Sequence, residues 1–505
     1  MGGTKVTSSH YKDEVTFFIY KNFKRRWDNM FNLTEKRFLE YREKKKTFPV
    51  TLKLSGDELT PIGIYYKLKG ERKFLLESVY SESEIGRFSF LGVNPYLTIK
   101  SYKEKIVIDN FKEVILAKGK ILDYVKKYVD AEYDKSLFNV PFTGGAVGYV
   151  GYDVIRQYEK LPDNNIDELK LPESYLMFYK TFICYDHFKH EIYIVYNVFS
   201  EDNSSYEDIT RELNKIKEDI TADSIMHKFK EVATAKTFES NVTEEEFCFM
   251  VNKAKEYIKA GDIFQVVLSQ RLKFKNTDNS FDVYRRLRAE NPSPYLFYFD
   301  FEEFQIAGSS PEILVSCINE TVTTNPIAGS RPRGANSKED EKLKLELLSD
   351  EKEMAEHLML VDLGRNDIGK ISKFGTVEVT RFMDVEFYSH IMHIVSAVSG
   401  KLKKGLNCFN ALSSCLPVGT VSGAPKVRAM EIIDELESIR RGSYAGAVGY
   451  FSCNGNMDMC IAIRTIIFKD EYSYVQAGAG IVYDSDPKTE YKETLNKAMA
   501  MREVI

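Results

Sequence analysis

The stretch AGAVGYFSCNGNMDMCIAIRTIIFKDEYSYVQAGAGIV, residues 445–482, decides which fold we expect for this chain. Its apolar runs at 445–452, 458–468 and 474–482 are typical of strands, and Asn454-Gly455 between the first two is a hairpin signal. Consecutive strands joined by tight turns form a meander, in which neighbouring strands are antiparallel. The stretch therefore predicts antiparallel sheet.

Helices are expected beside further strands. Residues 244–260 have a helical pattern that ends at Gly261, and residues 263–268 follow as a strand. Asp350 can cap a helix that runs to about Leu363, and Pro487 favours the start of a terminal helix. Residues 142–152 and 172–198 are strand-like. Antiparallel strands together with these helices predict the α+β class.

We divide the chain of 505 residues into three parts, since this length allows one to three domains. Residues 1–47 are an N-terminal extension without an assigned role. Residues 48–232 form an N-terminal half and residues 233–505 a C-terminal half, with a joint expected near 233–242.

Composition excludes several classes of protein. A net charge of −5 disfavours a general nucleic-acid binder, and no run of about 18 apolar residues predicts a membrane span. Seven cysteines without a CxxC pair disfavour a zinc ribbon or a disulfide framework. Reduced thiols in a cytoplasmic protein are the expectation.

Two acidic pairs share one spacing. Glu353 and Glu356 lie three apart on a predicted helix, and Glu490 and Glu493 repeat the pattern on the terminal helix. Residues three apart share a helix face, so two such edges can hold one Mg²⁺ through oxygen ligands. The alternative is two solvated acidic faces, which is the usual fate of such pairs.

Several segments can bind an anion. The glycine-rich residues 419–426 precede a helix but lack the P-loop spacing, and residues 476–480 are a strand with two glycines. Arg464 interrupts an apolar run and is either an edge residue or an anion ligand. His393 is either a hydrogen-bonded core residue or, with an ordinary pKa near ~6.5, a group for proton transfer.

Eight longer motifs, in this order, are similar to those of the chorismate-utilising enzymes. They occupy residues 75–78, 86–92, 326–334, 356–367, 419–428, 444–449, 460–465 and 478–482. Within that family the chain most resembles the large, synthase subunits of anthranilate synthases.

The resemblance implies two packed antiparallel sheets with helices outside and the site in the cleft. It implies that Glu356 and Glu493 bind Mg²⁺ directly, with Glu353 and Glu490 next to them. The residues implied to hold the carboxylates of chorismate are Tyr444, Arg464, Lys497, Thr420 and the backbone of Gly478, Ala479 and Gly480. His393 is implied beside the ring, and Glu312 as the acid near the leaving 4-hydroxyl.

Two positions select the nucleophile. Water-using relatives, such as isochorismate synthases, carry a basic lysine where Gln265 stands, and glutamine cannot act as that base. Aminodeoxychorismate synthases carry a nucleophilic lysine where Ala328 stands, and alanine cannot form that adduct. The resemblance therefore implies ammonia attack at C2, then pyruvate elimination to anthranilate. Both synthases, and a non-catalytic tryptophan-binding regulator of the same fold, remain alternatives.

A partner subunit and an inhibitor are also expected. No cysteine lies in a glutaminase-like Gly-x-Cys-x-Gly elbow, so ammonia is expected from a separate glutamine amidotransferase subunit. Residues similar to the family's tryptophan-binding segments are Glu77, Ser78, Asn291, Pro292, Ser293, Pro294, Tyr295 and Leu296, with Cys460 beside them. Cys460 and Arg464 lie four apart on one predicted strand, which would place both on one face and couple the two sites.

Overall fold

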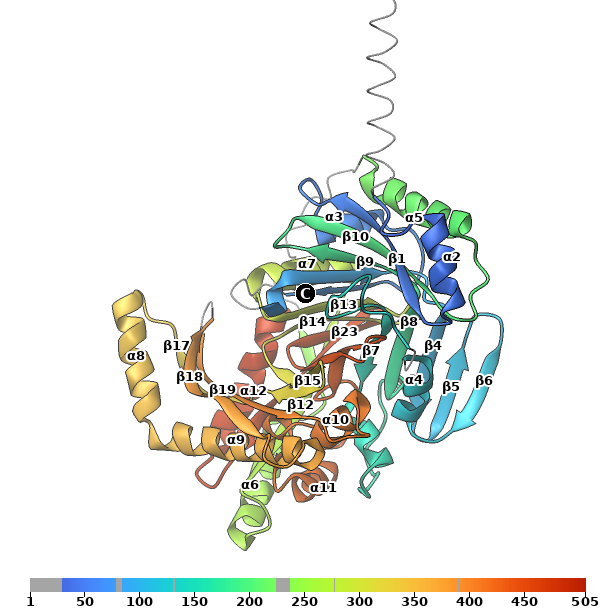
Figure 1. The fold of residues 1–505 in the computed structure, drawn as a ribbon. Helices are drawn as coiled ribbons and strands as arrows, with labels where there is room; N and C mark the ends of the chain where they lie inside the picture. The colour runs from blue at the N-terminus through green and yellow to red at the C-terminus, as the bar shows by residue number, and fades with distance from the viewer. Residues whose placement is uncertain (1–29, 79–83, 130–131, 224–236, 277, 389–390) are drawn as a thin grey trace, which may run out of the picture.

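Two twelve-stranded antiparallel sheets form the described part of the chain (Figure 1). The computed structural model describes residues 30–78, 84–129, 132–223, 237–276, 278–388 and 391–505. The predicted α+β class with two packed sheets is confirmed.

The first sheet contains β12 (Gln265–Lys275), β23 (Thr465–Lys469) and β24 (Tyr472–Ile481), which lead into the candidate site described below. In spatial order its strands are β1 (Phe48–Ser55), β10 (Glu191–Val198), β9 (Thr181–Asp186), β3 (Phe88–Gly92), β2 (Phe74–Glu77), β13 (Tyr295–Asp300), β14 (Gln305–Ser310), β23, β24, β12 and β11 (Phe238–Ser240), with β20 (Gly423–Ala424) paired to β12.

The second sheet contains the remaining strands. Their order is β17 (Ile327–Pro332), β19 (Ile391–Lys401), β16 (Thr321–Thr324), β15 (Ile313–Ile318), β22 (Met457–Ile461), β21 (Ala447–Ser452), β7 (Gly145–Val150), β8 (Ser174–Tyr179), β4 (Leu97–Tyr102), β5 (Lys105–Asp109) and β6 (Val114–Lys118), with β18 (Glu378–Phe387) paired to β19.

Helices surround the sheets. They are α2 (Glu35–Glu43), α3 (Pro61–Lys67), α4 (Ile121–Val129), α5 (Tyr206–Thr221), α6 (Glu244–Ala260), α7 (Ser280–Glu290), α8 (Ser337–Ser349), α9 (Glu351–Ile371), α10 (Cys408–Cys415), α11 (Lys426–Leu436) and α12 (Pro487–Arg502), with the 3-10 turns η1 (Glu84–Arg87), η2 (Tyr152–Gln157) and η3 (Gly419–Val421). None of the helices in the described ranges has the length and apolar character needed to cross a membrane.

The stretch 445–482 forms two hairpins rather than one meander. β21 pairs with β22 in the second sheet, whereas β23 pairs with β24 in the first. The predicted single strand 458–468 is therefore wrong, because the chain changes sheets at residues 462–464. Arg464 adopts a left-handed φ of +48° there, which ends one strand before the next begins.

The boundary expected near residue 233 does not separate the two sheets. Each sheet combines strands from residues 48–232 with strands from residues 233–505, and β2 pairs directly with β13. The last part of the expected extension also joins the core, since Phe38 of α2 is fully buried. Residues 1–29 lie outside the described residues.

Aromatic side chains fill part of the space between the sheets. Phe74 of the first sheet lies 4.8 Å, ring centre to ring centre, from Tyr179 of the second. Phe142, which precedes β7, contacts Phe90 at 5.3 Å and Tyr450 at 5.0 Å. Burial of such large rings is a main source of stability for packed sheets.

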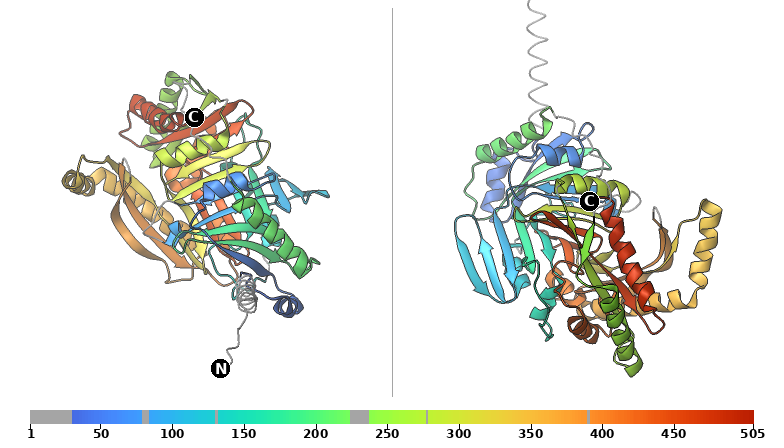
Figure 2. Two further views of the ribbon diagram at one scale, coloured as in Figure 1. Left: turned by 90° about the horizontal axis from the view of Figure 1, so that it is seen from above. Right: turned by 180° about the vertical axis from the view of Figure 1, so that it is seen from behind.

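An arm of α8, α9 and β17–β19 extends from the body beside α12 (Figures 1 and 2). Helix α9 packs on β17 and β19 of this arm, while α12 packs on β24 and α6 of the body. The two predicted acidic pairs are therefore carried by separate layers of the molecule.

Candidate functional site

Tyr444 and the glycines of β24 lie together. β24 pairs with β12 so that Gly478 is opposite Ser269, Ala479 opposite Leu268 and Gly480 opposite Val267. A Cβ on Gly478 would stand 2.8 Å from the hydroxyl oxygen of Tyr444, so glycine permits this close approach. Burial raises the pKa of Tyr444 to about 12, which keeps its phenol protonated and able to donate.

Arg464 is a partly buried cation without an anionic partner. Its guanidinium forms no ion pair with any residue that the structure describes, and burial lowers its pKa. A desolvated charge without a partner is costly in a folded protein. Such a group is suited to bind an anionic ligand.

Lys497 and His393 lie near Arg464. Lys497 Nζ is 3.1 Å from the carbonyl oxygen of Gly478, and 2.7 Å from Glu493 Oε1. Burial, together with the positive charges of Arg464 and Lys497, lowers the pKa of His393 to about 4. The pKa of His393 therefore lies below the ordinary value of 6.5, and its imidazole is neutral at pH 7.

The hydrogen bond of His393 defines its tautomer. Its Nδ1 is 3.0 Å from the carbonyl oxygen of Gly329, which can only accept. Nδ1 therefore carries the proton, and Nε2 has a lone pair available to a ligand. His390, its neighbour in the sequence motif, lies outside the described residues.

Glu312 is a buried carboxyl that is protonated at neutral pH. Burial raises its pKa to about 8, while the hydroxyl of Thr420 and the backbone at Ile327 lower it by less. Glu312 Oε1 and Thr420 Oγ1 both lack a partner at hydrogen-bond geometry among the described residues. Two unsatisfied polar atoms side by side indicate a ligand position.

The four predicted metal ligands interact across α9 and α12. Burial raises the pKa of Glu356, and the charges of Glu353 and Glu493 raise it further. Burial and Glu493 likewise raise the pKa of Glu490. Arg331 holds Glu353 at 3.3 Å. The charges of the two pairs therefore act on one another across α9 and α12.

The carboxylates do not meet as one ligand cluster. Among the described side chains, no group of three or more His, Cys, Asp or Glu lies close enough to hold a metal ion. Gln265 Nε2 donates to Glu356 Oε1 at 3.0 Å, and its own Oε1 is buried without a partner in the described part of the chain. Gln265 thus connects the acids to the anion-binding side.

The two predicted tryptophan segments are adjacent strands. β2 pairs with β13, which places Leu296 directly opposite Glu77. Glu77 Oε2 already accepts from Tyr284 at 2.8 Å and from Arg288 at 3.0 Å. Ser78 Oγ is buried and has no partner in the described ranges. The ammonium acceptor expected in Glu77 is thus already hydrogen-bonded.

The remaining residues of the second segment surround this pair. Asn291 ends α7, Pro292 and Pro294 are partly buried, and Ser293 is buried. Tyr295 donates to Asp458 at 3.0 Å, and Cys460 packs in the same aromatic core. Burial raises the pKa of Asp458 to about 7.

The coupling route expected through one strand face is wrong, because Cys460 and Arg464 lie on different sides of the sheet change. Hydrogen bonds provide another connection. Ser309 Oγ donates to Ser293 Oγ at 2.9 Å, and the Ser309 N–H donates to the carbonyl of Arg464 at 3.1 Å. The segment predicted to bind tryptophan is thus connected to the backbone of Arg464.

Sequence reasoning missed the buried pair Arg441 and Glu437. Both side chains are almost fully buried and lie 2.6 Å apart, next to Tyr444 in the chain. The Arg-Arg-Gly run gave no signal that one arginine points inward. Their contacts are described below.

Comparison with known proteins shows the family to which the chain belongs. Residues 71–503 match the family described as chorismate binding enzyme. Anthranilate synthase component 1 of Acetivibrio thermocellus is 49% identical over 471 residues, which cover 90% of this chain and 95% of that protein. The crystal structure of anthranilate synthase component I from Streptococcus pneumoniae TIGR4 has a TM-score of 0.77 and 42% identity, and the match covers 89% of this chain and 98% of that one.

A more distant structure shares the fold alone. A menaquinone-specific isochorismate synthase from Escherichia coli is 17% identical with a TM-score of 0.68, over 93% of this chain and 98% of that one. The fold therefore does not by itself select the nucleophile. The chain belongs to the chorismate binding enzymes. Within that family it is an enzyme of the anthranilate synthase component 1 kind.

Proposed function

We propose that this enzyme converts chorismate and ammonia to anthranilate and pyruvate with bound Mg²⁺. The observation that carries the proposal is the partly buried Arg464, which forms no ion pair with a described residue and acts on His393 together with Lys497, while Lys497 also contacts Glu493 of the acidic pairs. Chorismate is a dianion that must lose a poor leaving group. Cationic side chains can bind one carboxylate and a bound metal ion can bind the other, and both stabilise the charge that develops as the hydroxyl leaves.

The acidic pairs fit Mg²⁺ by the chemistry of their donors. Burial, and to a smaller extent the charges of neighbouring acids, raises the pKa of Glu356 and of Glu490, so a cation between α9 and α12 would stabilise their charged forms. Mg²⁺ keeps several waters and takes only one or two carboxylates directly, so Glu356 and Glu493 suffice. Bound Mg²⁺ would supply Lewis-acid stabilisation of a chorismate carboxylate.

The chain's own groups can carry the protons. Ammonia adds at C2, the double bonds shift, and the 4-hydroxyl leaves as water with a proton from Glu312, whose pKa of about 8 keeps it protonated. Loss of the C2 proton and of pyruvate then makes the ring aromatic. Neutral His393, with a free Nε2, is the base available beside the ring.

Gln265 and Ala328 support ammonia as the nucleophile. Gln265 lies 3.0 Å from Glu356 and cannot deprotonate water, while Ala328 on β17 cannot form an adduct with the ring. These two positions favour amination over the isochorismate and aminodeoxychorismate alternatives.

Ammonia would come from a glutamine amidotransferase subunit. Relatives are named component 1, which implies a second component. Tryptophan would act as the inhibitor at the β2–β13 pair, where Ser78 offers an unpartnered hydroxyl. A cytoplasmic location, expected from the sequence, would suit the seven cysteines, none of which forms a disulfide with another described residue.

One assay tests the proposal. Purified chain with chorismate, Mg²⁺ and ammonium should release fluorescent anthranilate and pyruvate, and glutamine should not replace ammonium. Glu356→Gln should lower kcat/KM by about 10²-fold or more through loss of the metal. Full activity in EDTA would refute the Mg²⁺ assignment. Absence of anthranilate from the wild type would refute the reaction and favour the regulator.

A further inference from the structure

Arg441 is among the largest fully buried side chains in the described residues, and its guanidinium donates to Glu437 and to two backbone carbonyls that adjoin the site. Its Nε donates to Glu437 Oε2 at 2.9 Å, and its Nη2 to Glu437 Oε1 at 2.6 Å. Its Nη1 donates to the carbonyl of Val421 at 2.7 Å, and its Nη2 to that of Val267 at 2.7 Å.

The two carbonyls belong to segments that would bind the substrate. Val421 follows Thr420 in η3, and Val267 of β12 is the register partner of Gly480 in β24. The guanidinium also lies 5.6 Å from the ring centre of Tyr444, three residues further along the chain. One side chain therefore contacts or adjoins three separate anion-binding segments.

Glu437 extends the same network to the strand beneath Gly478. Its Oε1 accepts from both the N–H and the hydroxyl of Ser269, each at 2.9 Å. Ser269 is the register partner of Gly478. Charge-assisted hydrogen bonds of this kind are shorter and stronger than neutral ones, so the network is rigid.

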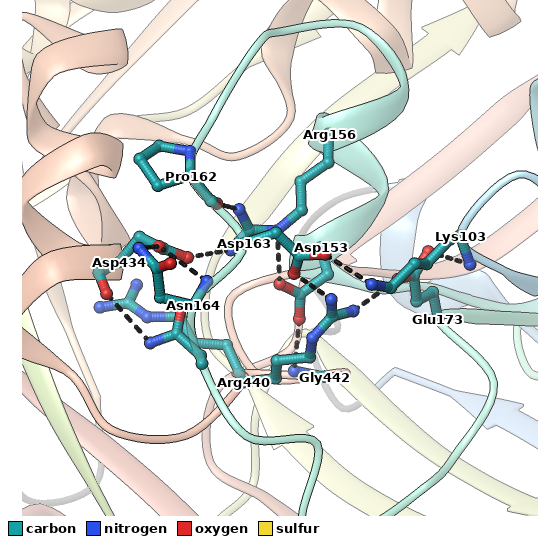
Figure 3. A network of polar contacts seen from close by, with 12 residues as sticks. Lys103, Asp153, Arg156, Pro162, Asp163, Asn164, Glu173, Asp434, Arg440 and Gly442 are labelled. Carbon is teal, nitrogen blue, oxygen red and sulfur yellow. Dashed lines mark hydrogen bonds and ion pairs between the residues drawn. The ribbon is translucent and has the colours of Figure 1, made fainter.

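The chain just before Tyr444 is also held by contacts that do not involve Arg441. Arg440 binds Asp163 and Glu173 of the N-terminal half, and the Gly442 N–H donates to Asp153 at 3.0 Å (Figure 3). Asp434 on α11 accepts from Arg156 at 2.6 Å (Figure 3). The chain before Tyr444 is thus held from outside by these contacts and from inside by Arg441.

We propose that Arg441, paired with Glu437, is a positioning residue for chorismate binding. It sets the spacing of Thr420, the Gly478–Gly480 backbone and Tyr444, and it does not touch the substrate itself. This inference rests on the proposed function, since it concerns the same site. A displacement of about 1 Å among such groups costs roughly 10²-fold in rate.

The test separates positioning from stability. Arg441→Met leaves Glu437 as an uncompensated buried charge, so it should lower both the thermal midpoint and chorismate affinity. In Arg441→Met/Glu437→Leu both charges are gone, and apolar replacement of a buried ion pair is often neutral. The double variant should regain most of the thermal midpoint but keep a chorismate KM raised about 10- to 100-fold.

Arg286→Met is the matched control. Arg286 is also buried and binds one carbonyl and one carboxylate, Val504 at 2.8 Å and Asp278 at 2.7 Å, neither of them in the site. It should lose stability while its chorismate KM stays within about 3-fold. Affinity is also measured by equilibrium dialysis of chorismate in EDTA without ammonium, which gives a readout independent of turnover.

Recovery of both stability and affinity in the double variant would overturn the inference, as would equal weakening in Arg286→Met. If Arg441→Met does not fold, the double variant and Arg286→Met still decide. Failure of the proposed function is distinct, because wild-type chain would then form no anthranilate whatever the variants do.

Discussion

The region proposed to bind chorismate and the region proposed to bind tryptophan, called here the chorismate region and the tryptophan region, differ in how many of their polar groups already have hydrogen-bond or ionic partners. In the first, the Arg464 guanidinium, Glu312 Oε1, Thr420 Oγ1 and Gln265 Oε1 have no partner among the described residues. In the second, Glu77 is bound by Arg288 and Tyr284, and Tyr295 by Asp458. Of the groups named for that site, the Ser78 hydroxyl lacks a partner in the described ranges.

This difference between the two regions is the one expected between a substrate site and a regulatory site. Unsatisfied buried groups cost free energy without ligand, and a ligand that satisfies them recovers about 1–3 kcal/mol for each. A site whose groups already bind one another must exchange partners, so its ligand gains less and two arrangements compete. The first arrangement suits a substrate site and the second suits a regulatory one.

The largest expected effect is a loss of kcat/KM that occurs when the chorismate region is altered and not when the tryptophan region is altered. Arg464→Met removes the unpaired cation and should lower kcat/KM for chorismate about 10³-fold, because a buried charge-assisted contact to a carboxylate is lost. Arg288→Met, on the tryptophan side, should leave kcat/KM within about 3-fold. Steady-state kinetics with saturating ammonium and Mg²⁺ measures both. Similar losses in the two variants would show that the regions are not distinct.

The second effect concerns two buried acids with raised pKa values. Glu312 must be protonated to act in the proposed mechanism, so wild-type kcat/KM should fall as the pH rises through about 8. Glu312→Gln keeps the shape but has no proton to give, so kcat should drop about 10²-fold and this alkaline limb should disappear.

Asp458→Asn is its counterpart in the tryptophan region. The pKa of Asp458 is raised to about 7, yet its carboxyl binds Tyr295 and not the chorismate groups. Its substitution should leave the fall of kcat/KM at alkaline pH in place. If the fall in activity at alkaline pH persisted in Glu312→Gln and disappeared in Asp458→Asn, it would have to be assigned to Asp458 and not to Glu312.

The third effect is a change of product. Gln265→Lys places an amine beside Glu356, so amination should fall about 10-fold and hydroxylated product should become detectable by mass spectrometry. Gln265→Met removes the amide without adding a base and should lower amination only. Identical product mixtures from the two variants would exclude position 265 from nucleophile choice.

Local signals in the sequence predicted those elements whose ends are marked by particular residues. The helix predicted at 244–260 has those bounds, because Thr243 caps it and Gly261 takes a left-handed φ of +83°. The helix after Asp350 runs eight residues beyond Leu363, to Ile371, since Gly364 does not end it. A glycine does not necessarily end a helix when packing stabilises the turn that contains it.

Properties that depend on distant parts of the chain were not predictable. The run Cys460 to Phe468 is apolar apart from Arg464 and Thr465, and neither of these residue types by itself predicts the change of sheet at 462–464 or the left-handed φ of Arg464. The lowered pKa of His393 results from burial and from the positive charges of Arg464, just before β23, and of Lys497 on α12, both of which are distant in the sequence. The residue types of the site were recognisable, whereas their charge states and partners required the fold.

The smallest expected effect sharpens the comparison from the tryptophan side. Ser78→Phe should fill the space beside Glu77 and raise the tryptophan concentration for half inhibition at least 10-fold, with kcat nearly unchanged. Coupling between two sites is typically about 1–3 kcal/mol, a 5- to 150-fold change in affinity, and it is reciprocal. Tryptophan titration of wild type and variant at fixed chorismate measures it.

The hydrogen-bonded route from Ser293 through Ser309 to the Arg464 carbonyl gives this prediction a second arm. Ser309→Ala removes the hydroxyl that joins the segments but keeps the N–H to Arg464. Tryptophan should still bind Ser309→Ala, because Glu77 and Ser78 are untouched, while its effect on chorismate KM should shrink. Equal inhibition of wild type and Ser78→Phe would place the inhibitor elsewhere, and full coupling in Ser309→Ala would exclude the serine route.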